Sequence, residues 1–236
     1  MSEQQEQERL VKAYLIDLGK VDYRDAHQFQ VDCVQWRLLE KDRPDIFLIT
    51  EHPPVFTLGK RGGRGSLTVG EEFIKNRGVD IVQTERGGDI TYHGPGQIVI
   101  YPIMHLREAR LSVKAYVDML EEVMISSAAD SGVTAGRDER NRGIWVGDNK
   151  IGSIGIRVRH GVAFHGLAFN VILDFEHFSW IQPCGLSGVG VTSVANESSE
   201  PVDFSVVKQN VINQLGRVFN RQFTAVEKTL VTGGTV

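Results

Sequence analysis

The sequence predicts one mixed α/β domain, a mixed β-sheet flanked by helices. Short apolar or alternating segments, which are typical of strands, take turns along the chain with segments that carry apolar residues at helical spacing. No internal repeat or low-complexity linker divides the 236 residues, and this length suits one large domain. We expect a single domain over 1–236 with its core at about 12–220, so that the first ten residues and the tail after 223 are peripheral; the alternative adds a small C-terminal lobe.

The first half of the chain predicts strands and helices in turn. Residues 12–18 alternate as a strand does, and residues 25–40 carry Val31, Val34 and Leu38 along one helical stripe. Further strands are expected over 45–50, 81–84 and 97–103, and a short helix over 71–76. The strand over 45–50 ends before two prolines, which cannot donate to a β-ladder.

The clearest helical pattern covers residues 112–127. Ser112 is a suitable N-cap. The residues expected to face the core are Val113, Tyr116, Val117, Leu120 and Met124. A final amphipathic helix is predicted over 203–220 from Val207, Val211, Leu215 and Val218.

The segment from residue 144 to residue 173 predicts a short strand and then a β-hairpin. Residues 150–159 alternate, and His160-Gly161 suits a two-residue loop. That loop places Ser153 opposite Ala168 and Gly155 opposite Gly166. These small residues would leave a bare strip of sheet against which a flat or linear ligand can rest.

Composition and charge give no indication of a nucleic-acid-binding, membrane-spanning or exported protein. The formal net charge is -4, no apolar run is long enough to span a bilayer, and the first ten residues are polar and acidic. Two cysteines indicate a reducing compartment without a disulfide framework. We expect a cytoplasmic protein without nucleic-acid or membrane partners.

Residues 86–97 are the densest unusual segment. They carry four glycines, a proline and several polar side chains directly before an apolar strand. Glycines allow a close backbone approach, and Arg86, Tyr92 and His93 can supply polar contacts. The pattern alone fits a ligand-binding loop or an ordinary surface loop.

Cys184 lies in a turn-prone segment between a proline and a glycine. It can be a nucleophile if a nearby cation favours the thiolate, or a buried inert thiol. Lys150 can be that cation or a solvated surface lysine. Cys33 lies within a helical stripe and is expected to be structural.

The seven histidines do not predict a metal site, because metal-ligand spacing is absent from the sequence. His160 and His165 are five residues apart and point to opposite faces of a strand. His52, His93 and His165 are better interpreted as pocket or packing residues. Nucleotide-binding fingerprints are also absent, so no metal or cofactor is expected.

With these residues in view, the chain closely resembles the lipoyl(octanoyl) transferases, which move an octanoyl group from acyl carrier protein onto a lysine of lipoyl domains. The resemblance depends on residues 51–59, 86–97, 150–155, 165–170, 183–186 and 191–193, in the family's order. It implies a fold similar to the biotin/lipoate protein ligase catalytic domain.

The resemblance also implies the site. The catalytic pair falls on Cys184 and Lys150, with Cys184 carrying an acyl thioester. The implied substrate-binding residues are Arg86, Gly87, Gly88, Asp89, Ile90, Thr91, Tyr92, His93, Ser153, Ile154, Gly155, Gly166, Leu167 and Ala168. The implied partners are octanoyl-acyl carrier protein, lipoyl domains of 2-oxoacid dehydrogenase complexes and the glycine cleavage H protein.

Two other classes of function remain open at this point. One is an ATP-dependent lipoate or biotin ligase on the same scaffold, with residues 62–65 binding nucleotide phosphate. The other is a non-catalytic acyl-binding module. Carrier proteins are acidic, and five basic residues form either a local docking surface or scattered solvated charges: Lys60, Arg61, Arg64, Arg157 and Arg159.

Overall fold

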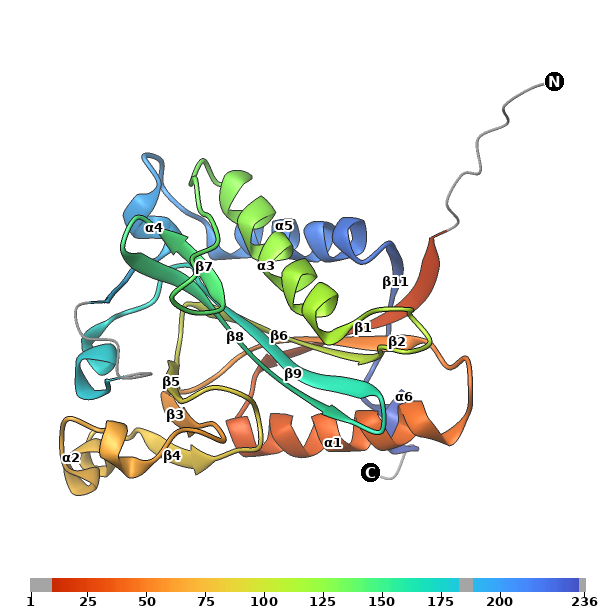
Figure 1. Ribbon diagram of the computed structural model, residues 1–236, viewed down its shortest axis with the longest axis horizontal. Coiled ribbons are helices and arrows are strands. Elements are labelled where there is room, and N and C mark those ends of the chain that lie inside the picture. Colours follow the sequence, from red (N-terminus) through yellow and green to blue (C-terminus); the bar gives the residue numbers. More distant parts are fainter. Residues whose placement is uncertain (1–9, 183–188, 234–236) are drawn as a thin grey trace.

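The computed structural model describes residues 10–182 and 189–233. Among these residues, eight strands form one mixed sheet in the order β10-β8-β9-β6-β2-β1-β11, with β7 paired to β8 (Figure 1). Their bounds are β1 Val11–Lys20, β2 Asp45–Glu51, β6 Gln97–His105, β7 Gly143–Val146, β8 Asn149–Arg159, β9 Val162–Asn170, β10 Gly190–Val191 and β11 Arg221–Ala225. A smaller sheet, in the order β4-β3-β5, consists of β3 Val55–Leu58, β4 Asp80–Gln83 and β5 Ile90–His93.

Helices cover both faces of the large sheet. Figure 1 shows α3 (Val113–Ala129) and α5 (Phe204–Val218) on one face and α1 (Tyr23–Leu39) on the other. The remaining helical segments are short: η1 Arg64–Ser66, α2 Glu71–Asn76, η2 Glu176–Trp180, α4 Val194–Glu197 and α6 Thr229–Thr232. This arrangement is the predicted fold class, a mixed sheet flanked by helices.

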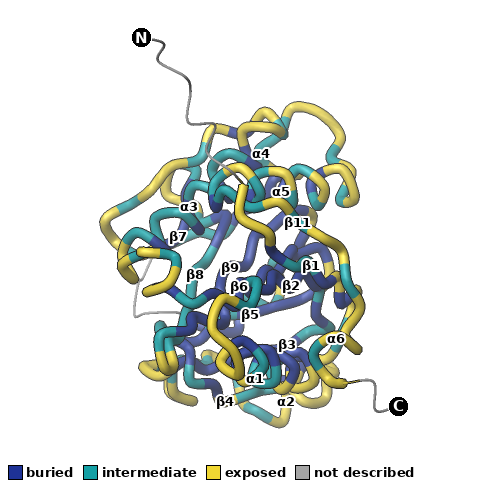
Figure 2. Tube along the Cα trace, turned by 90° about the vertical axis from the view of Figure 1, so that its right-hand side faces the viewer, coloured by how far each residue is buried: buried dark blue, intermediate teal, exposed yellow. Residues whose placement is uncertain are grey.

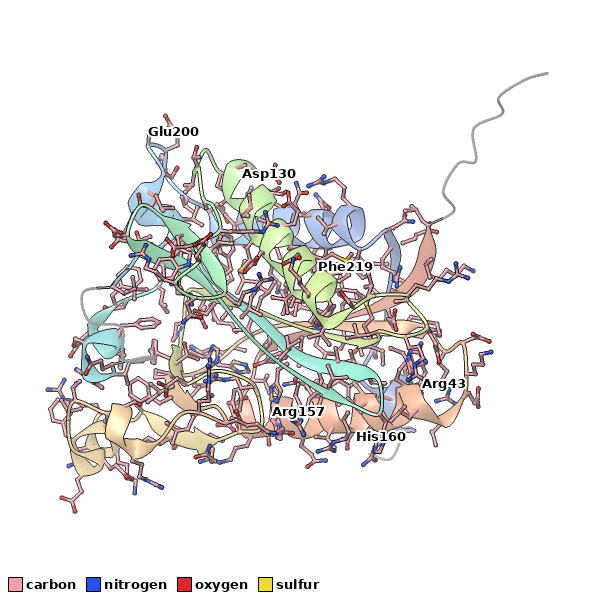
Figure 3. The ribbon with its side chains drawn as sticks, in the orientation of Figure 1. Arg43, Asp130, Arg157, His160, Glu200 and Phe219 are labelled. Atoms are coloured by element: carbon pink, nitrogen blue, oxygen red, sulfur yellow. The ribbon has the colours of Figure 1, made fainter. Side chains whose placement is uncertain are left out.

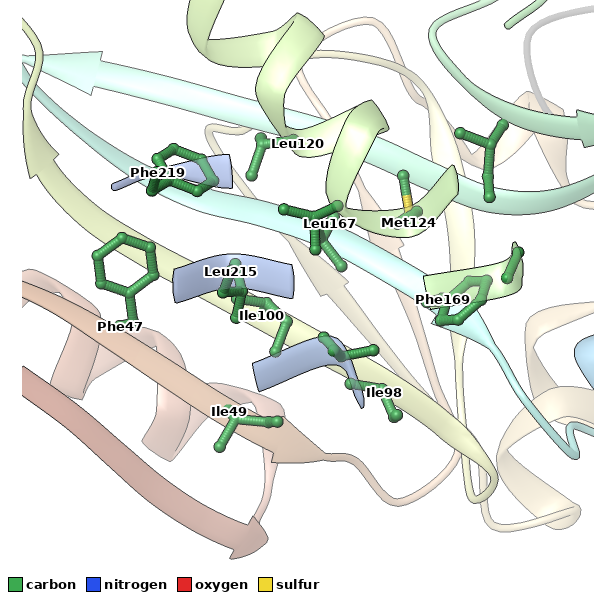
Figure 4. Close-up of a cluster of buried hydrophobic side chains, with 14 of the residues drawn as sticks. Phe47, Ile49, Ile98, Ile100, Leu120, Met124, Leu167, Phe169, Leu215 and Phe219 are labelled. Atoms are coloured by element: carbon green, nitrogen blue, oxygen red, sulfur yellow. The ribbon is translucent and has the colours of Figure 1, made fainter. Parts of the chain in front are cut away.

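Each face of the large sheet has its own core. The core beneath α3 and α5 contains Leu120, Leu167 and Leu215 (Figure 4), and the core beneath α1 contains Phe29 and Phe164. Buried residues follow the central strands, and exposed residues gather at the outer turns (Figure 2). The small sheet packs on a third cluster, which includes Phe56 and Trp180.

Helix α1 buries a different stripe from the predicted one. Val34 is buried as expected, and so is Cys33, but Leu38 is exposed. Gln30 and Arg37 are buried instead, and partners bind some of their polar atoms, while Gln30 Nε2 and Arg37 Nη1 have no hydrogen-bond partner among the described residues. The Gln30 Oε1 atom accepts a hydrogen bond from the backbone N–H of His165 at 2.9 Å, and Arg37 pairs with Asp45 at the start of β2.

Helix α3 begins where the sequence predicts. The hydroxyl of Ser112 accepts a hydrogen bond from the backbone N–H of Ala115 at 3.1 Å and so caps the helix. Tyr116, Leu120 and Met124 are buried as predicted. The prediction for Val113 is wrong, because this first residue of the helix is half exposed and contact with the core begins one turn later.

Four of the described strands were absent from the sequence-based elements: the two-residue strand β10, and β3, β5 and β11. The four residues of β3 are buried directly after the two prolines. Strand β5 lies within the segment interpreted as a loop, where it pairs antiparallel with β3. Strand β11 pairs parallel with β1, from Val11 opposite Arg221 to Leu15 opposite Ala225. The end of the described chain therefore extends the large sheet and forms no separate lobe.

The hairpin of β8 and β9 has the predicted register. Ser153 lies opposite Ala168 and Gly155 lies opposite Gly166. The loop residues His160 and Gly161 have φ angles of 50° and 86°, as a two-residue hairpin turn with positive φ requires. Figure 3 shows His160 at the turn and Arg157 in the outer half of the hairpin.

Candidate functional site

A pocket of about 420 Å³ opens between the large sheet and the small sheet. Its walls come from segments far apart in sequence, and most of the predicted site residues line it. These are Arg86, Gly88, Asp89, Ile90, Thr91, His93, Lys150, Ser153, Ile154, Gly155, Gly166, Leu167 and Ala168. The hairpin strip and the glycine-rich segment are thus two walls of one cavity.

The two walls are in close contact at Gly155. The backbone N–H of Gly87 donates to the carbonyl oxygen of Ile156 at 2.8 Å. A Cβ atom at Gly155 would lie 2.9 Å from the carbonyl oxygen of Gly87 and 3.0 Å from Cδ of Arg86. A glycine is therefore required for the segment to cross β8 at this distance.

Arg86 lines the pocket and also supports its wall. It is 7% exposed, and its Nη2 atom donates to the carbonyl oxygen of Thr57 at 2.6 Å. Its Nε atom donates to the hydroxyl of Thr57 at 3.2 Å. The guanidinium thus joins the glycine-rich segment to β3, because several of its donors are used by one residue of that strand.

Tyr92 and Gly87 do not line the pocket among the described residues. Residues alternate along β5, so that His93 faces the cavity and Tyr92 faces the core of the small sheet. The Tyr92 ring stacks on His177 with a centroid distance of 4.6 Å and contacts Phe56. We assign Tyr92 to packing and Gly87 to the crossing over β8.

Aromatic and imidazole rings line the part of the pocket beneath α1. The sequence indicated His93 and His165 as pocket or packing residues, but not Tyr23 and Tyr101. Tyr23 of α1 stacks on His93 with a centroid distance of 5.9 Å. Burial lowers the pKa of His93 to about 3, so this histidine is neutral at pH 7. Burial also raises the pKa of Tyr23 to about 12. Tyr101 and His165 also line the pocket, so this part of the wall presents uncharged tyrosines and a neutral His93.

A polar network holds His93 in place. Its Nδ1 atom lies 2.7 Å from Oε1 of Gln97, and Nε2 of Gln97 donates to Oδ1 of Asn170 at 2.9 Å. His52 is fully buried beside the pocket, where its Nε2 atom lies 2.8 Å from the hydroxyl of Tyr101. His93 and His165 are therefore pocket residues, and His52 packs behind Tyr101.

Lys150 lines the pocket near the start of β8. Its Nζ atom donates to the carbonyl oxygen of Arg142 at 2.9 Å and lies 5.3 Å from the ring centroid of Trp145. Asn141 and Trp145 line the pocket beside it. Sequence analysis missed both residues, and no spacing signal connects them with Lys150.

Cys184 lies outside the described residues. Its nearest described neighbours in the chain are Gln182 and Val189, and both line the pocket. The described chain therefore lines the cavity directly before residue 183 and again directly after residue 188.

Three side chains of metal-ligating type meet beside the pocket. Ligand atoms of His27, Glu85 and His165 lie within 4.8 Å of one another. Sequence spacing could not reveal this group, because its members come from three separate segments. Interaction with His165 and His27 lowers the pKa of Glu85 to about 2, and Arg159 lies 3.9 Å from its other oxygen. The carboxylate thus has cationic and hydrogen-bonding partners of its own, and we assign the group to ion pairing.

The predicted basic surface is partly neutralised. Arg64 pairs with Glu71, and Arg159 lies near Glu85. This surface has two parts, residues 60–64 and the outer half of β8. They are connected through the pocket wall, because the backbone N–H of Lys60 donates to the carbonyl oxygen of Arg86 at 2.9 Å. The segment at residues 60–64 and the outer half of β8 therefore border the same wall.

Fold and pocket together define a class of protein: mixed-sheet α/β domains with a pocket between a β-hairpin and a glycine-rich segment. Residues 22–216 match the family model of the lipoyl protein ligase A/B catalytic domain. The chain belongs to this family. An octanoyltransferase from Desulfotalea psychrophila is 49% identical over 217 residues, which cover 91% of this chain and 97% of that protein.

Solved structures share the fold at low identity. A bi-partite lipoate protein ligase from Thermoplasma acidophilum superposes with a TM-score of 0.74 at 16% identity, covering 94% of this chain and 91% of that one. A biotin protein ligase from Aquifex aeolicus has a TM-score of 0.51 at 11% identity, covering 87% of this chain and 70% of that one. The expected similarity to the biotin/lipoate ligase fold is confirmed.

Within residues 10–182 and 189–233, no helix is long and apolar enough to cross a bilayer.

Proposed function

We propose that the protein transfers an octanoyl group from octanoyl-acyl carrier protein to the lysine amine of lipoyl domains, through a thioester on Cys184. The observation that carries this proposal is the pocket. It is lined by the small-residue strip, by Lys150 and by the rings of Tyr23 and His93. The 49% identity to an octanoyltransferase supports the same activity. Lipoyl domains of 2-oxoacid dehydrogenase complexes and the glycine cleavage H protein are the proposed acceptors.

In the first step the thiolate of Cys184 attacks the carbonyl carbon of the carrier thioester. A new carbon–sulfur bond forms, the bond to the pantetheine sulfur breaks, and the leaving thiolate takes a proton from the ammonium of Lys150. Before that transfer the ammonium favours the thiolate form of Cys184. One thioester replaces another, so this step is nearly isoenergetic.

In the second step the neutral amine of the target lysine attacks the acyl-enzyme. A carbon–nitrogen bond forms, the bond to the Cys184 sulfur breaks, and neutral Lys150 takes the proton of the incoming amine. Both residues return to their starting protonation states. Because an amide is more stable than a thioester, this step is downhill and the sequence of reactions needs no nucleotide.

The acyl chain would lie along Ser153, Gly155 and Ala168. Burying six methylenes at about 0.8 kcal/mol each contributes roughly 5 kcal/mol before ordering costs. This is enough to prefer octanoyl to much shorter chains. Chains that differ by one methylene would be separated by only about fourfold.

An ATP-dependent ligase is the principal alternative. Its phosphate site would fall on residues 62–65, and no described residue that lines the pocket comes from that stretch. A non-catalytic acyl-binding module is the other alternative, and it would use the same cavity. The two alternatives differ from the transferase in whether Cys184 becomes acylated without ATP.

Intact mass after incubation with octanoyl-acyl carrier protein separates these functions. We expect wild type to gain an octanoyl mass that hydroxylamine removes, and Cys184→Ser to gain no such adduct. Absence of the adduct on wild type would remove the covalent mechanism. Formation of an octanoyl adenylate only with ATP would support a ligase, and binding without turnover would support an acyl-binding module.

A further inference from the structure

A buried carboxylate lies behind Lys150 on α3. Glu121 is 1% exposed and does not line the pocket. Its Oε1 atom accepts a hydrogen bond from the backbone N–H of Gly143 at 2.9 Å and lies 3.3 Å from Nε of Arg142. Its Oε2 atom accepts from Nε of Arg137 at 3.1 Å. Burying a carboxylate is costly unless it is paired in this way.

One peptide group connects this carboxylate with Lys150. The N–H of Gly143 and the carbonyl of Arg142 belong to the same peptide unit, which is planar and rigid. The N–H donates to Glu121, and the carbonyl oxygen accepts from Nζ of Lys150 at 2.9 Å. A carboxylate and an ammonium therefore bind opposite edges of one peptide, and each polarises it in the sense that strengthens the other hydrogen bond.

The backbone at this peptide has a conformation that favours glycine. Gly143 has a φ of 127°, and a Cβ atom there would lie 2.2 Å from the carbonyl oxygen of Gly152 and 2.8 Å from Cε of Lys150. The Lys150 side chain thus packs directly against the Gly143 backbone. Any shift of this peptide would displace the ammonium.

Among the described acidic residues of α3, Glu121 differs from its neighbours. Asp118 pairs with Arg142 and Glu122 pairs with Arg137, both at the partly exposed edge of the helix. Glu121 is the buried member and contacts both arginines. The residue that binds the peptide is therefore also the residue that joins both arginines to α3.

We propose that Glu121 is a positioning residue for Lys150: it fixes the Arg142–Gly143 peptide, whose carbonyl holds the Lys150 ammonium at the reacting end of the pocket. This inference rests on the proposed acyl transfer, since it assigns Lys150 a position in that reaction. Glu121 touches no substrate and acts through Lys150.

The test compares Glu121→Gln with Glu122→Gln. The two substitutions remove the same charge from adjacent residues that share Arg137, but only the first alters the contact with the Gly143 N–H. We expect Glu121→Gln to lower kcat for octanoyl transfer by about tenfold or more, the scale of one weakened hydrogen bond to a charged group. We expect its KM for octanoyl-acyl carrier protein to stay within about twofold, and Glu122→Gln to retain wild-type kcat.

A double-mutant cycle distinguishes positioning from general damage. If Glu121 acts through Lys150, Glu121→Gln has little further effect on the rate of Lys150→Ala, so the two losses are strongly non-additive. Additive losses, or an unchanged kcat in Glu121→Gln, would overturn the inference. If Glu121→Gln does not fold by circular dichroism, Glu121→Asp keeps the charge, is expected to give an intermediate loss, and takes its place in the cycle.

The cycle is interpretable only if wild type transfers octanoyl, and this separates the two proposals. A wild type that forms no octanoyl-lipoyl-domain product contradicts the proposed function itself. An active wild type with additive losses contradicts only the role of Glu121.

Discussion

Gly155→Ala tests whether the crossing of the glycine-rich segment over β8 shapes the acyl site. The new Cβ would lie 2.9 Å from the carbonyl oxygen of Gly87, whereas ordinary contacts are 3.4 Å or longer. The Gly87 segment must therefore move by at least about 0.5 Å. That shift strains the 2.8 Å hydrogen bond from Gly87 to Ile156, and weakening one such bond costs about 0.5–1.5 kcal/mol.

This cost predicts two measurable changes. The KM for octanoyl-acyl carrier protein should rise about 2- to 12-fold, and Tm should fall by about 1–6 °C. The assay is steady-state octanoylation of a lipoyl domain, followed by mass spectrometry, with thermal unfolding by circular dichroism. Gly65→Ala is the matched control, because a Cβ at Gly65 meets no atom within 4 Å. If Gly155→Ala equals Gly65→Ala in both KM and Tm, the close crossing has no role in the acyl site.

Four further changes have expected outcomes. Lys150→Ala should fold normally and lose at least about 100-fold in rate; wild-type turnover would refute its proton-transfer role. Burial lowers the pKa of His93 in the folded protein to about 3, so as the pH falls the unfolded chain binds a proton before the folded one does. The free energy of unfolding therefore decreases as pH drops from about 6.5 towards 3, by up to about 1.4 kcal/mol per pH unit. Urea unfolding at pH 7 and pH 5 should show a smaller loss for His93→Gln than for wild type, and equal losses would contradict this account. Burial raises the pKa of the Cys33 thiol, so in a variant whose other cysteine is serine, iodoacetamide should label Cys33 only after unfolding; labelling of the folded protein would place it elsewhere. Reversing the charges of Arg61 and Arg64 should raise KM for the acidic carrier at low salt, which an unchanged KM would exclude.

Local sequence rules predicted the hairpin because its register depends on a two-residue loop. The pairs Ser153–Ala168 and Gly155–Gly166 follow from His160-Gly161 alone. The opposite holds for β5, which pairs with a strand more than 30 residues away in the chain. Its glycine-rich surroundings favour a loop in sequence terms, and only tertiary pairing makes it a strand.

In the helices, too, local sequence patterns do not predict every buried side chain. The spacing in α1 predicted a purely apolar stripe. The helix also buries Gln30 and Arg37, whose partners lie on β9 and β2. The position of Lys150 likewise depends on Glu121, a residue of α3 that no local pattern connects with the site. Such contacts become visible only when the folded chain brings distant segments together.

The pairing of β11 with β1 has a consequence for the ends of the chain. Residues 221–225 cover the outer edge of a long strand, and their own edge is short, with Gln222 and Thr224 exposed. Short edge strands resist pairing with other chains. A protein shortened after α5 would keep every described residue of the pocket but would expose the unpaired backbone of β1. The last strand therefore protects the molecule against aggregation, independently of anything that happens in the pocket.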